Sequence, residues 1–389
     1  MRWVTTAARA MLLLSLLASI PREGPASAAS CSLVLGFASF RERLGTAIVG
    51  DCLDDQFSTA SGNAQQHTTG GLLTWRNADN WLAFSDGYQS WVDGPDGIRR
   101  RLNTERFPWE LDDRPLPPGA TGMLLAAGDI AGCEDPAIAQ NAEATARLLE
   151  TMPGTILALG DLAYEEGSAA EYATCYDPRW GRLKARTQPA TGNHEYETPG
   201  AAGYFDYFGP IAGEPGAGYY SFDVGGWHII ALNSNCALIG GCRRGSPEEQ
   251  WLRADLRTHP ALCTLAYWHH PRFVSGRDGG SESVAGLWDA LYEAGADVVL
   301  SGHEHFYERL TPLDPQGNLD LDRGIRSFVV GTGGRSHHEF DAILPASEVR
   351  DNQTFGVLAL TLYPASYTWQ FVPAGDSGFS DSGAGTCHR

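Results

Sequence analysis

The chain has 389 residues, 43% of them hydrophobic, and a formal net charge of −19 at pH 7. This length favours one large domain and a smaller one, and the hydrophobic fraction is sufficient for a globular core. The acidic balance argues against nucleic-acid polymers and anionic membranes as partners, because both repel a negative surface. It does not exclude a small phosphate ester that is bound by local cations.

The N-terminus has the pattern of a targeting segment. Arginines precede an apolar stretch over residues 10–20, and residues 26–28 offer the small side chains that a signal peptidase requires. The stretch is shorter than the roughly 20 apolar residues that span a bilayer. We therefore predict a signal peptide over residues 1–28, no transmembrane segment and a secreted mature protein. A lipoprotein anchor at residues 29–31 is a weaker interpretation, because the usual leucine is absent.

All eight cysteines follow the predicted signal peptide, and an even number in an exported chain predicts a disulfide framework. No Cys-x-x-Cys pattern typical of zinc sites is present. The pairs Cys31–Cys52 and Cys236–Cys242 are the easiest to close, because their members are near each other in sequence. The residues alone leave the pairing of the other four open: Cys133, Cys175, Cys263 and Cys387.

The pattern beyond the signal peptide predicts a small β-rich module of unknown function over residues 30–112. Short β-like runs, separated by Asn, Asp and Gly turn signals, occur at residues 72–76, 81–84 and 88–92. We interpret the tryptophans of this module as an aromatic core rather than a ligand platform. A proline-rich linker over residues 113–120 then leads to a larger domain over residues 121–389.

Strands and helices alternate at the start of the larger domain. An apolar run at 123–127 ends in a glycine and Asp129, and a helix is predicted over 141–150. The next apolar run, at 155–159, ends in a glycine and Asp161. This βαβ order predicts parallel strands and an α/β fold.

Later apolar runs also end in polar or glycine-rich clusters. The run at 265–268 leads into His269-His270-Pro271, and the run at 297–300 leads into Gly302-His303-Glu304-His305. In open α/β sheets, ligands bind beyond the carboxyl ends of the strands. We therefore expect these clusters to meet at one edge of the sheet.

Each of these motifs also has an ordinary structural interpretation. A single aspartate after a strand, such as Asp129 or Asp161, is usually a helix N-cap. His303 and His305 are a stronger signal, because residues two apart in an extended segment face one side and can reach two neighbouring metals. Residues 192–195 (Gly-Asn-His-Glu) add an amide oxygen, an imidazole and a carboxylate within one turn. Five such motifs at strand ends together indicate a functional site rather than a purely structural role.

In this order the motifs resemble the signature of the calcineurin-like metallophosphoesterases, most closely that of their purple acid phosphatase branch. The resemblance begins at about residue 121, continues to the C-terminus and does not include the N-terminal module. Many members of the broader superfamily carry a histidine two residues after the first aspartate, where this chain has Ala131. Here Tyr164 instead stands three residues after Asp161, as it does in purple acid phosphatases.

The resemblance implies a four-layer α/β/β/α sandwich with two metal ions. The first metal would be held by Asp129, Asp161, Tyr164 and His305. The second would be held by Asp161, Asn193, His269 and His303. Carboxylate and phenolate oxygens suit Fe(III) at the first position, and imidazole and amide ligands suit Zn, Mn or Fe(II) at the second.

Two further histidines are candidates for direct roles in catalysis, beside the bridging Asp161. His194 could hydrogen-bond a phosphoryl oxygen or protonate the leaving group, or it could merely orient Asn193. We select His269 rather than His270 as the ligand, because the family pattern places the ligand two residues before the proline. His270 would then support a ligand or face the substrate.

The sequence therefore predicts a secreted two-metal phosphatase that hydrolyses small phosphate monoesters. A phosphodiesterase or nucleotide hydrolase with the same site is the alternative among enzymes, and a binding protein that has lost the chemistry is the alternative outside them. The resemblance also suggests Cys133–Cys175 and Cys263–Cys387 as the remaining disulfides. The oligomeric state is not indicated by the sequence.

Overall fold

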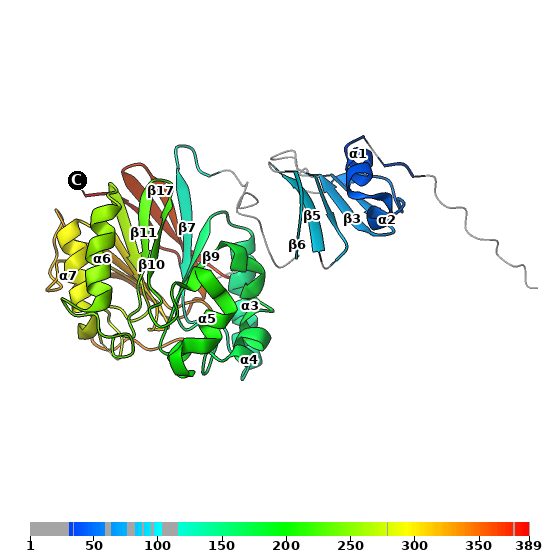
Figure 1. Cartoon of the computed structure of the whole chain (residues 1–389). Helices are drawn as coiled ribbons and strands as arrows, with labels where there is room; N and C mark the ends of the chain where they lie inside the picture. Colours follow the sequence, from blue (N-terminus) through cyan, green and yellow to red (C-terminus); the bar gives the residue numbers. More distant parts are fainter. Residues whose placement is uncertain are drawn as a thin grey trace, which may run out of the picture.

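The computed structural model of the chain is shown in Figure 1. It describes residues 31–33, 35–58, 64–75, 82–87, 89–94, 97–102, 116–277, 279–375 and 378–388. The predicted signal peptide and residues 103–115, which include the start of the predicted linker, lie outside these residues, so the proposed domain boundaries stay a prediction. Within the described part of the chain, every helix is too short or too polar to cross a bilayer.

The N-terminal region forms one antiparallel sheet in which each strand pairs with the next along the chain. Its elements are α1 (Leu35–Leu44), α2 (Thr46–Val49), β1 (Phe57–Ser58), β2 (Ala64–Thr68), β3 (Gly71–Trp75), β4 (Leu82–Ser85), β5 (Gln89–Gly94) and β6 (Gly97–Leu102). Phe37 and Phe40 of α1 are buried together with Phe84 of β4, and Trp75 and Trp91 pack against this cluster. Trp81 lies outside the described residues. The β-rich character is confirmed, and these two tryptophans belong to a core.

The larger region contains two sheets. The first has the order β19-β18-β17-β7-β8-β9, and the second has the order β10-β11-β12-β13-β15-β14-β16. The strands of the first sheet are β7 (Gly122–Ala127), β8 (Thr155–Leu159), β9 (Thr187–Ala190), β17 (Gly356–Tyr363), β18 (Ser366–Pro373) and β19 (Ser382–Thr386). The strands of the second are β10 (Tyr220–Val224), β11 (Trp227–Ala231), β12 (Cys263–Tyr267), β13 (Val298–Ser301), β14 (Tyr307–Leu310), β15 (Arg326–Val330) and β16 (Ser347–Asp351).

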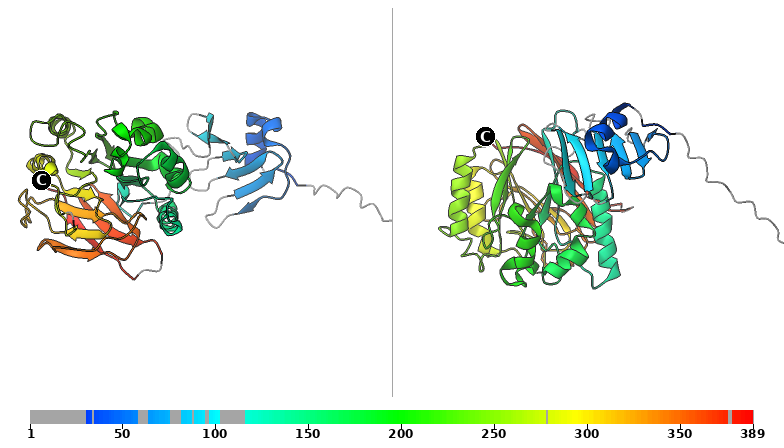
Figure 2. Two further views of the ribbon diagram at one scale, coloured as in Figure 1. Left: turned by 90° about the horizontal axis from the view of Figure 1, so that it is seen from below. Right: turned by 45° about the vertical axis from the view of Figure 1, so that its right-hand side comes forward.

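Successive side chains of the buried strands pack on opposite faces of each sheet, so each sheet is covered by the other sheet on one face and by helices on the other. In β11, Ile229 joins the core between the two sheets, whereas Ile230 packs on the other face with Leu252 and Trp288. These two partners belong to α6 (Pro247–Thr258) and α7 (Ala285–Ala294). The helix α3 (Pro136–Glu150) covers the first sheet, and α6 and α7 cover the second (Figures 1 and 2). The predicted α/β/β/α sandwich is confirmed.

Parallel strands bring the polar clusters together. β7 pairs in parallel with β8, and β12 pairs in parallel with β13. The loops beyond them remain joined, because the Asp129 N–H donates to the Gly160 carbonyl at 3.0 Å. The Gly302 N–H likewise donates to the His269 carbonyl at 3.0 Å. The expectation of a single sheet edge was wrong, because β7 and β8 belong to the first sheet whereas β12 and β13 belong to the second. The clusters meet where the carboxyl ends of these strands in the two sheets come together, since Gly302 lies directly beside Asp129.

The helix after β7 begins earlier than the sequence pattern predicts. We expected residues 141–150, but α3 starts at Pro136 and is capped by Asp135, whose side chain accepts the Ala137 N–H at 2.8 Å. Proline at the first helical position is favourable because its missing N–H has no partner there in any case. Asp135 is the N-cap of this helix, so Asp129 is available for another role.

All four expected disulfides are present. Cys31 is bonded to Cys52 and Cys236 to Cys242, across 21 and 6 residues. The two pairs that the residues alone left open are Cys133–Cys175 and Cys263–Cys387, across 42 and 124 residues. The last of these ties the C-terminal segment to β12. No free cysteine is present among the described residues.

Candidate metal centre

Three of the predicted ligand residues have a left-handed backbone conformation. Asp129, Asp161 and His303 have φ values of 60°, 52° and 71°. Side chains other than glycine rarely adopt this conformation, and such strain concentrates at functional sites. Each residue follows a glycine at a strand end, and the space there is tight. A Cβ atom on Gly302 would lie 2.7 Å from Asp129 Oδ2, so the glycine permits the close approach.

The first group of donors surrounds the phenol oxygen of Tyr164. This oxygen lies 3.0 Å from Asp129 Oδ1, 3.2 Å from Asp161 Oδ2 and 3.3 Å from His305 Nε2. Tyr164 is 2% exposed and Asp129 is fully buried. The four side chains predicted to hold the first metal therefore converge on one point.

The second group of donors surrounds the amide oxygen of Asn193. Asn193 Oδ1 lies 3.1 Å from His269 Nε2 and 3.1 Å from His303 Nδ1. His269 Nε2 is also 3.0 Å from Asp161 Oδ2. Asp161 thus contacts both groups, through the same carboxylate oxygen that contacts Tyr164.

Hydrogen bonds on the outer side of two rings orient their inner nitrogens. His269 Nδ1 donates to the Leu159 carbonyl at 2.9 Å, which leaves Nε2 to face the carboxylate of Asp161. His305 Nδ1 lies 2.7 Å from Ser336 Oγ, which leaves Nε2 to face Tyr164. Histidines that bind metals in proteins are commonly held in this way.

The conformation of the last histidine motif differs from our expectation. We predicted an extended segment in which His303 and His305 face one side. Instead His303 is left-handed, and residues 302–306 form a tight bend in which the Glu304 N–H donates to the Gly302 carbonyl at 2.9 Å. The physical cause is the His303 N–H, which donates to Asp129 Oδ2 at 2.9 Å and turns the backbone inward. The bend still directs the two rings to different groups of donors.

The electrostatics of the site favour positive charge. Burial alone would raise the pKa of Asp161, but the neighbouring His269 and His194 lower the pKa below its ordinary value. Burial opposes protonation of His269, yet Asp161 and Asp129 raise its pKa to about 9. Burial and the same two carboxylates raise the pKa of the Tyr164 phenol well above 10. Cations held between these groups would supply the positive charge that the carboxylates require.

Glu195 is not a predicted ligand, but its side chain holds the backbone of the site in place. Its buried carboxylate accepts the backbone N–H groups of Asp161 at 2.9 Å, Leu162 at 2.8 Å and Gly192 at 2.7 Å. Tyr172 donates its hydroxyl to the same carboxylate at 3.1 Å. Glu195 therefore joins the loop that carries Asp161 to the loop that carries Asn193.

His194 and His270 lie at the site but make different contacts. The His194 ring packs 4.4 Å from the Tyr164 ring, and its Nδ1 lies 2.5 Å from the Glu165 carbonyl oxygen. His270 lies 4.5 Å from His303, measured between ring centroids. Its Nδ1 lies 2.8 Å from Ser234 Oγ.

Sequence reasoning missed two segments that support the site. Ser234 follows β11, and Arg335, Ser336 and His338 follow β15. The guanidinium of Arg335 lies 4.7 Å from the Tyr164 ring centroid, and His338 stacks on His305 at 3.9 Å. Each segment is a polar cluster after a buried strand, which is the signal that identified the other loops.

The comparison with protein families agrees with this arrangement. Residues 123–307 match the family of calcineurin-like phosphoesterases, and this span contains all seven of the predicted ligand residues. Over this span the chain is similar to the members of that family. The resemblance inferred from the motifs is confirmed, and its nearest branch is that of the purple acid phosphatases.

Individual relatives and one solved structure are similar to parts of the chain. Purple acid phosphatase 15 of Arabidopsis thaliana is 28% identical over 225 residues, which cover 48% of this chain and 41% of that protein. A nucleotide pyrophosphatase/phosphodiesterase of Hordeum vulgare is 24% identical over 289 residues, which cover 63% of this chain and 75% of that protein. The structure of a purple acid phosphatase from yellow lupin seeds superimposes with a TM-score of 0.61 at 19% identity, covering 80% of this chain and 60% of that one. The chain spans less than half of the Arabidopsis relative.

Proposed function

We propose that this protein is an exported metal-dependent phosphatase that hydrolyses small phosphate monoesters at a two-metal site. The observation that carries the proposal is the convergence of the predicted ligand side chains into two groups of donors that share Asp161. Family membership supports phosphoester hydrolysis as the reaction. The disulfides support export, because such bonds persist mainly in oxidising compartments.

The donor set fits a pair of metal ions. Ligands that bind one ion at about 2.0–2.3 Å lie roughly 3 Å from each other. Within each of the two groups, around Tyr164 and around Asn193, the contacting donor atoms lie 3.0–3.3 Å apart. Asp129, Asp161, Tyr164 and His305 would hold the first ion, and Asp161, Asn193, His269 and His303 the second. A phenolate ligand favours Fe(III) at the first position, with Zn, Mn or Fe(II) at the second.

The side chains of the protein would position the two metal ions and the backbone around them. Two bound metals would draw charge from the phosphoryl oxygens and activate a water molecule. Asp161 holds the two groups of donors at a fixed separation. Glu195 keeps the backbone of this centre in place through the N–H groups it accepts. Because these groups are buried, little rearrangement is needed when charge develops in the transition state.

His194 is our candidate for contact with the phosphoryl oxygen or the leaving group. The carbonyl of Glu165 can only accept a hydrogen bond, so the adjacent Nδ1 of His194 carries a hydrogen. Its Nε2, 3.9 Å from Asp161 Oδ2, lies beside the shared carboxylate. This arrangement leaves Nε2 for the substrate, whereas the backbone N–H of His194 donates to Asp161 Oδ1 at 2.9 Å.

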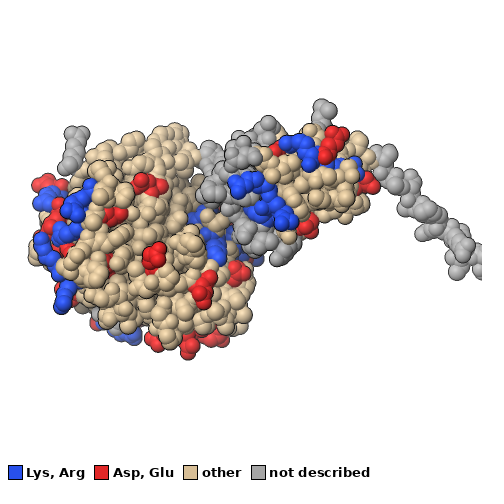
Figure 3. Space-filling view, viewed as in Figure 1, with Lys and Arg blue, Asp and Glu red and all other residues tan. Residues whose placement is uncertain are grey.

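A small substrate is also consistent with the charge on the face drawn in Figure 3, where Lys and Arg side chains alternate with Asp and Glu beside α6 and α7. Arg253 is paired there with Glu249 and Glu293, and Arg244 with Glu293. Arginines whose charge is already paired with a carboxylate attract a polyanion only weakly.

Activity against a panel of esters tests the proposal. The wild type, loaded with Fe(III) and Zn, is expected to hydrolyse p-nitrophenyl phosphate with a higher kcat/KM than bis-p-nitrophenyl phosphate. Preference for the diester would favour the phosphodiesterase alternative, which the barley relative supports. Absence of hydrolysis of both esters in a metal-loaded protein would favour a binding protein.

A further inference from the structure

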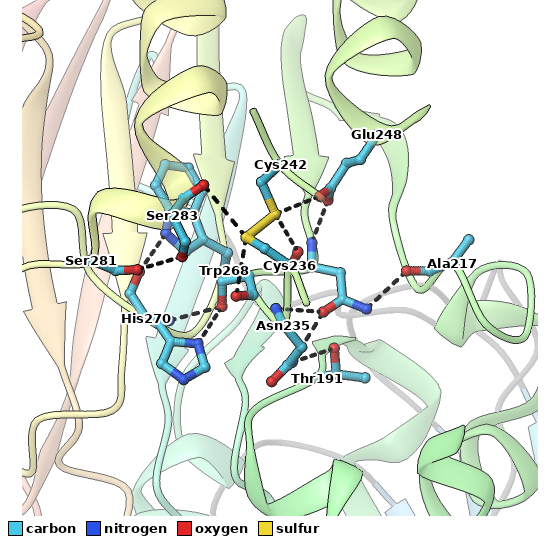
Figure 4. The surroundings of a disulfide bond; sticks show 12 residues. Thr191, Ala217, Asn235, Cys236, Cys242, Glu248, Trp268, His270, Ser281 and Ser283 are labelled. Atoms are coloured by element: carbon cyan, nitrogen blue, oxygen red, sulfur yellow. Dashed lines mark hydrogen bonds between the residues drawn. A yellow bond between two sulfur atoms is a disulfide. The ribbon is translucent and has the colours of Figure 1, made fainter. Parts of the chain in front are cut away.

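The hydroxyl of Ser234 makes two contacts with the same residue. It accepts the backbone N–H of His270 at 2.9 Å, and it lies 2.8 Å from Nδ1 of the His270 ring. Ser234 is 4% exposed, so water does not compete for these contacts. Figure 4 shows a hydrogen bond at one nitrogen of the His270 ring, whereas the second nitrogen makes none with the residues drawn.

The position of the hydroxyl hydrogen follows from the available partners. Among the described residues, the only acceptor that Ser234 Oγ contacts is His270 Nδ1. If Nδ1 carried a hydrogen, the buried hydroxyl would have no acceptor, which is costly. Ser234 therefore donates to Nδ1, and Nδ1 is the unprotonated nitrogen. The hydrogen of the neutral ring resides on Nε2.

The ring of His270 lies next to two of the predicted ligands. One ring nitrogen of each of His269, His270 and His303 lies within 4.8 Å of the others. Because Nδ1 of His270 is occupied by Ser234, Nε2 is the nitrogen that is left to contact a bound molecule. A donor at this place complements the oxygens of a phosphoryl group.

The segment that carries Ser234 is itself held rigidly. The side-chain amide of Asn235 donates to the Gly192 carbonyl at 3.2 Å, next to the predicted ligand Asn193. Asn233 donates its backbone N–H to Glu248 at 2.6 Å, and the disulfide Cys236–Cys242 closes the loop that follows (Figure 4). Ser234 therefore occupies a fixed position relative to the centre.

We propose that Ser234 sets the tautomer of His270, so that His270 presents Nε2–H as a fixed hydrogen-bond donor to the phosphoryl group. This inference rests on the proposed function for the identity of the acceptor. Ser234 is a positioning residue, and its contribution passes through His270. A neutral imidazole with hydrogen on Nε2 cannot accept a proton at that atom, so His270 stabilises charge rather than acting as the base.

The kinetic arm of the test uses Ser234→Ala, His270→Ala and the double variant, with Ser283→Ala as control. Ser283 belongs to the same neighbourhood, but among the described residues its hydroxyl contacts Ser281 rather than His270. We expect Ser234→Ala to lower kcat about 10- to 100-fold, with KM and metal content nearly unchanged. In the His270→Ala background the same change should have little further effect. Ser234→Thr keeps a hydroxyl and should restore much of the activity.

A spectroscopic arm remains informative whether or not the protein proves to be a phosphatase. Nitrogen-15 NMR of histidine-labelled, zinc-loaded wild type reports which ring nitrogen of His270 bears hydrogen, with the signals assigned through His270→Gln. We expect hydrogen on Nε2 in the wild type and a loss of this preference in Ser234→Ala. Hydrogen on Nδ1 in the wild type would overturn the proposal, as would additive losses of activity in the double variant. Loss of the tautomer preference without hydrolysis by the wild type would refute the proposed function alone.

Discussion

The carboxylate of Glu195 accepts the backbone N–H of Asp161 at 2.9 Å, so a buried side chain fixes the residue that joins the two groups of donors. We predict that Glu195→Gln lowers activity by about 10- to 100-fold, because its amide NH2 group would face backbone donors. Stability should also fall, by roughly 1–3 kcal/mol. Metal content, kcat and thermal unfolding measure these effects.

Glu197→Gln is the matched control for this change, because Glu197 is exposed and lies two residues away. It should leave metal content and activity within a factor of two of the wild type. Equal losses of metal content and activity in both variants would mean that Glu195 does not specifically stabilise the metal centre.

The sequence predicted much of this site because its signals are local. Glycine followed by Asp129 or Asp161 after an apolar run marks a strand end, and parallel pairing brings such ends together. The contributions of Ser234 and Ser336 could not be predicted in the same way. They depend on contacts with His270 and His305 that only the three-dimensional fold creates.

The conformation of His303 and the start of α3 were also not predictable from periodicity. The left-handed turn at His303 follows from a hydrogen bond to Asp129, which is distant in sequence. The first turn of α3 contains Pro136 and two alanines around the single large apolar residue Ile138, which is too little to give an amphipathic signal. Boundaries of this kind depend on capping and on tertiary contacts.

A second prediction concerns pH-dependent stability at a buried histidine outside the site. His228 lies 2.9 Å from Asp223 through Nδ1 and 2.8 Å from Asp255 through Nε2. Asp255 also faces His259 and accepts a hydrogen bond from Ser221. Burial disfavours the charged imidazole, but the two carboxylates raise the pKa of His228 above 6.5. Burial would raise the pKa of Asp255, but His228 lowers it below 3.8.

The sign of the effect follows from these two shifts. The contribution of His228 is fully present below about pH 6.5 and is lost as pH rises through its folded-state pKa. The contribution of Asp255 is present above about pH 4 and is lost as pH falls. We expect His228→Asn to cost roughly 1–3 kcal/mol at pH 5.5 and clearly less at pH 9. Urea unfolding at both values measures this, and a pH-independent cost would refute the ion-pair interpretation.

A third prediction separates the stabilising and functional effects of two disulfides. In the chain-entropy model, removing Cys263–Cys387 costs about 5 kcal/mol and removing Cys236–Cys242 about 2 kcal/mol, because their loops differ in length. Paired serine variants should therefore differ in unfolding free energy in this order. Activity should fall more in the Cys236→Ser/Cys242→Ser variant, since that loop follows Ser234. The opposite order of activities would show that the loop does not position the site.

A fourth prediction concerns the phenol of Tyr164. Phenolate bound to Fe(III) absorbs visible light, so the iron-loaded wild type should be pink to purple. Tyr164→Phe keeps the ring and removes the oxygen that contacts Asp129, Asp161 and His305, so the colour should disappear. A colourless wild type with bound iron, or a coloured Tyr164→Phe variant, would remove Tyr164 from the ligand set.

We propose that Asp161 joins two metal ions in one centre. Metal analysis of purified wild type, Asp161→Asn and Asp206→Asn tests it, because Asp206 is an exposed aspartate on α5 (Ala202–Phe208). We expect about two metal ions per chain in the wild type and in Asp206→Asn, and fewer than one in Asp161→Asn, with an unchanged circular dichroism spectrum. Two tightly bound ions in Asp161→Asn, together with normal phosphatase activity, would contradict the account.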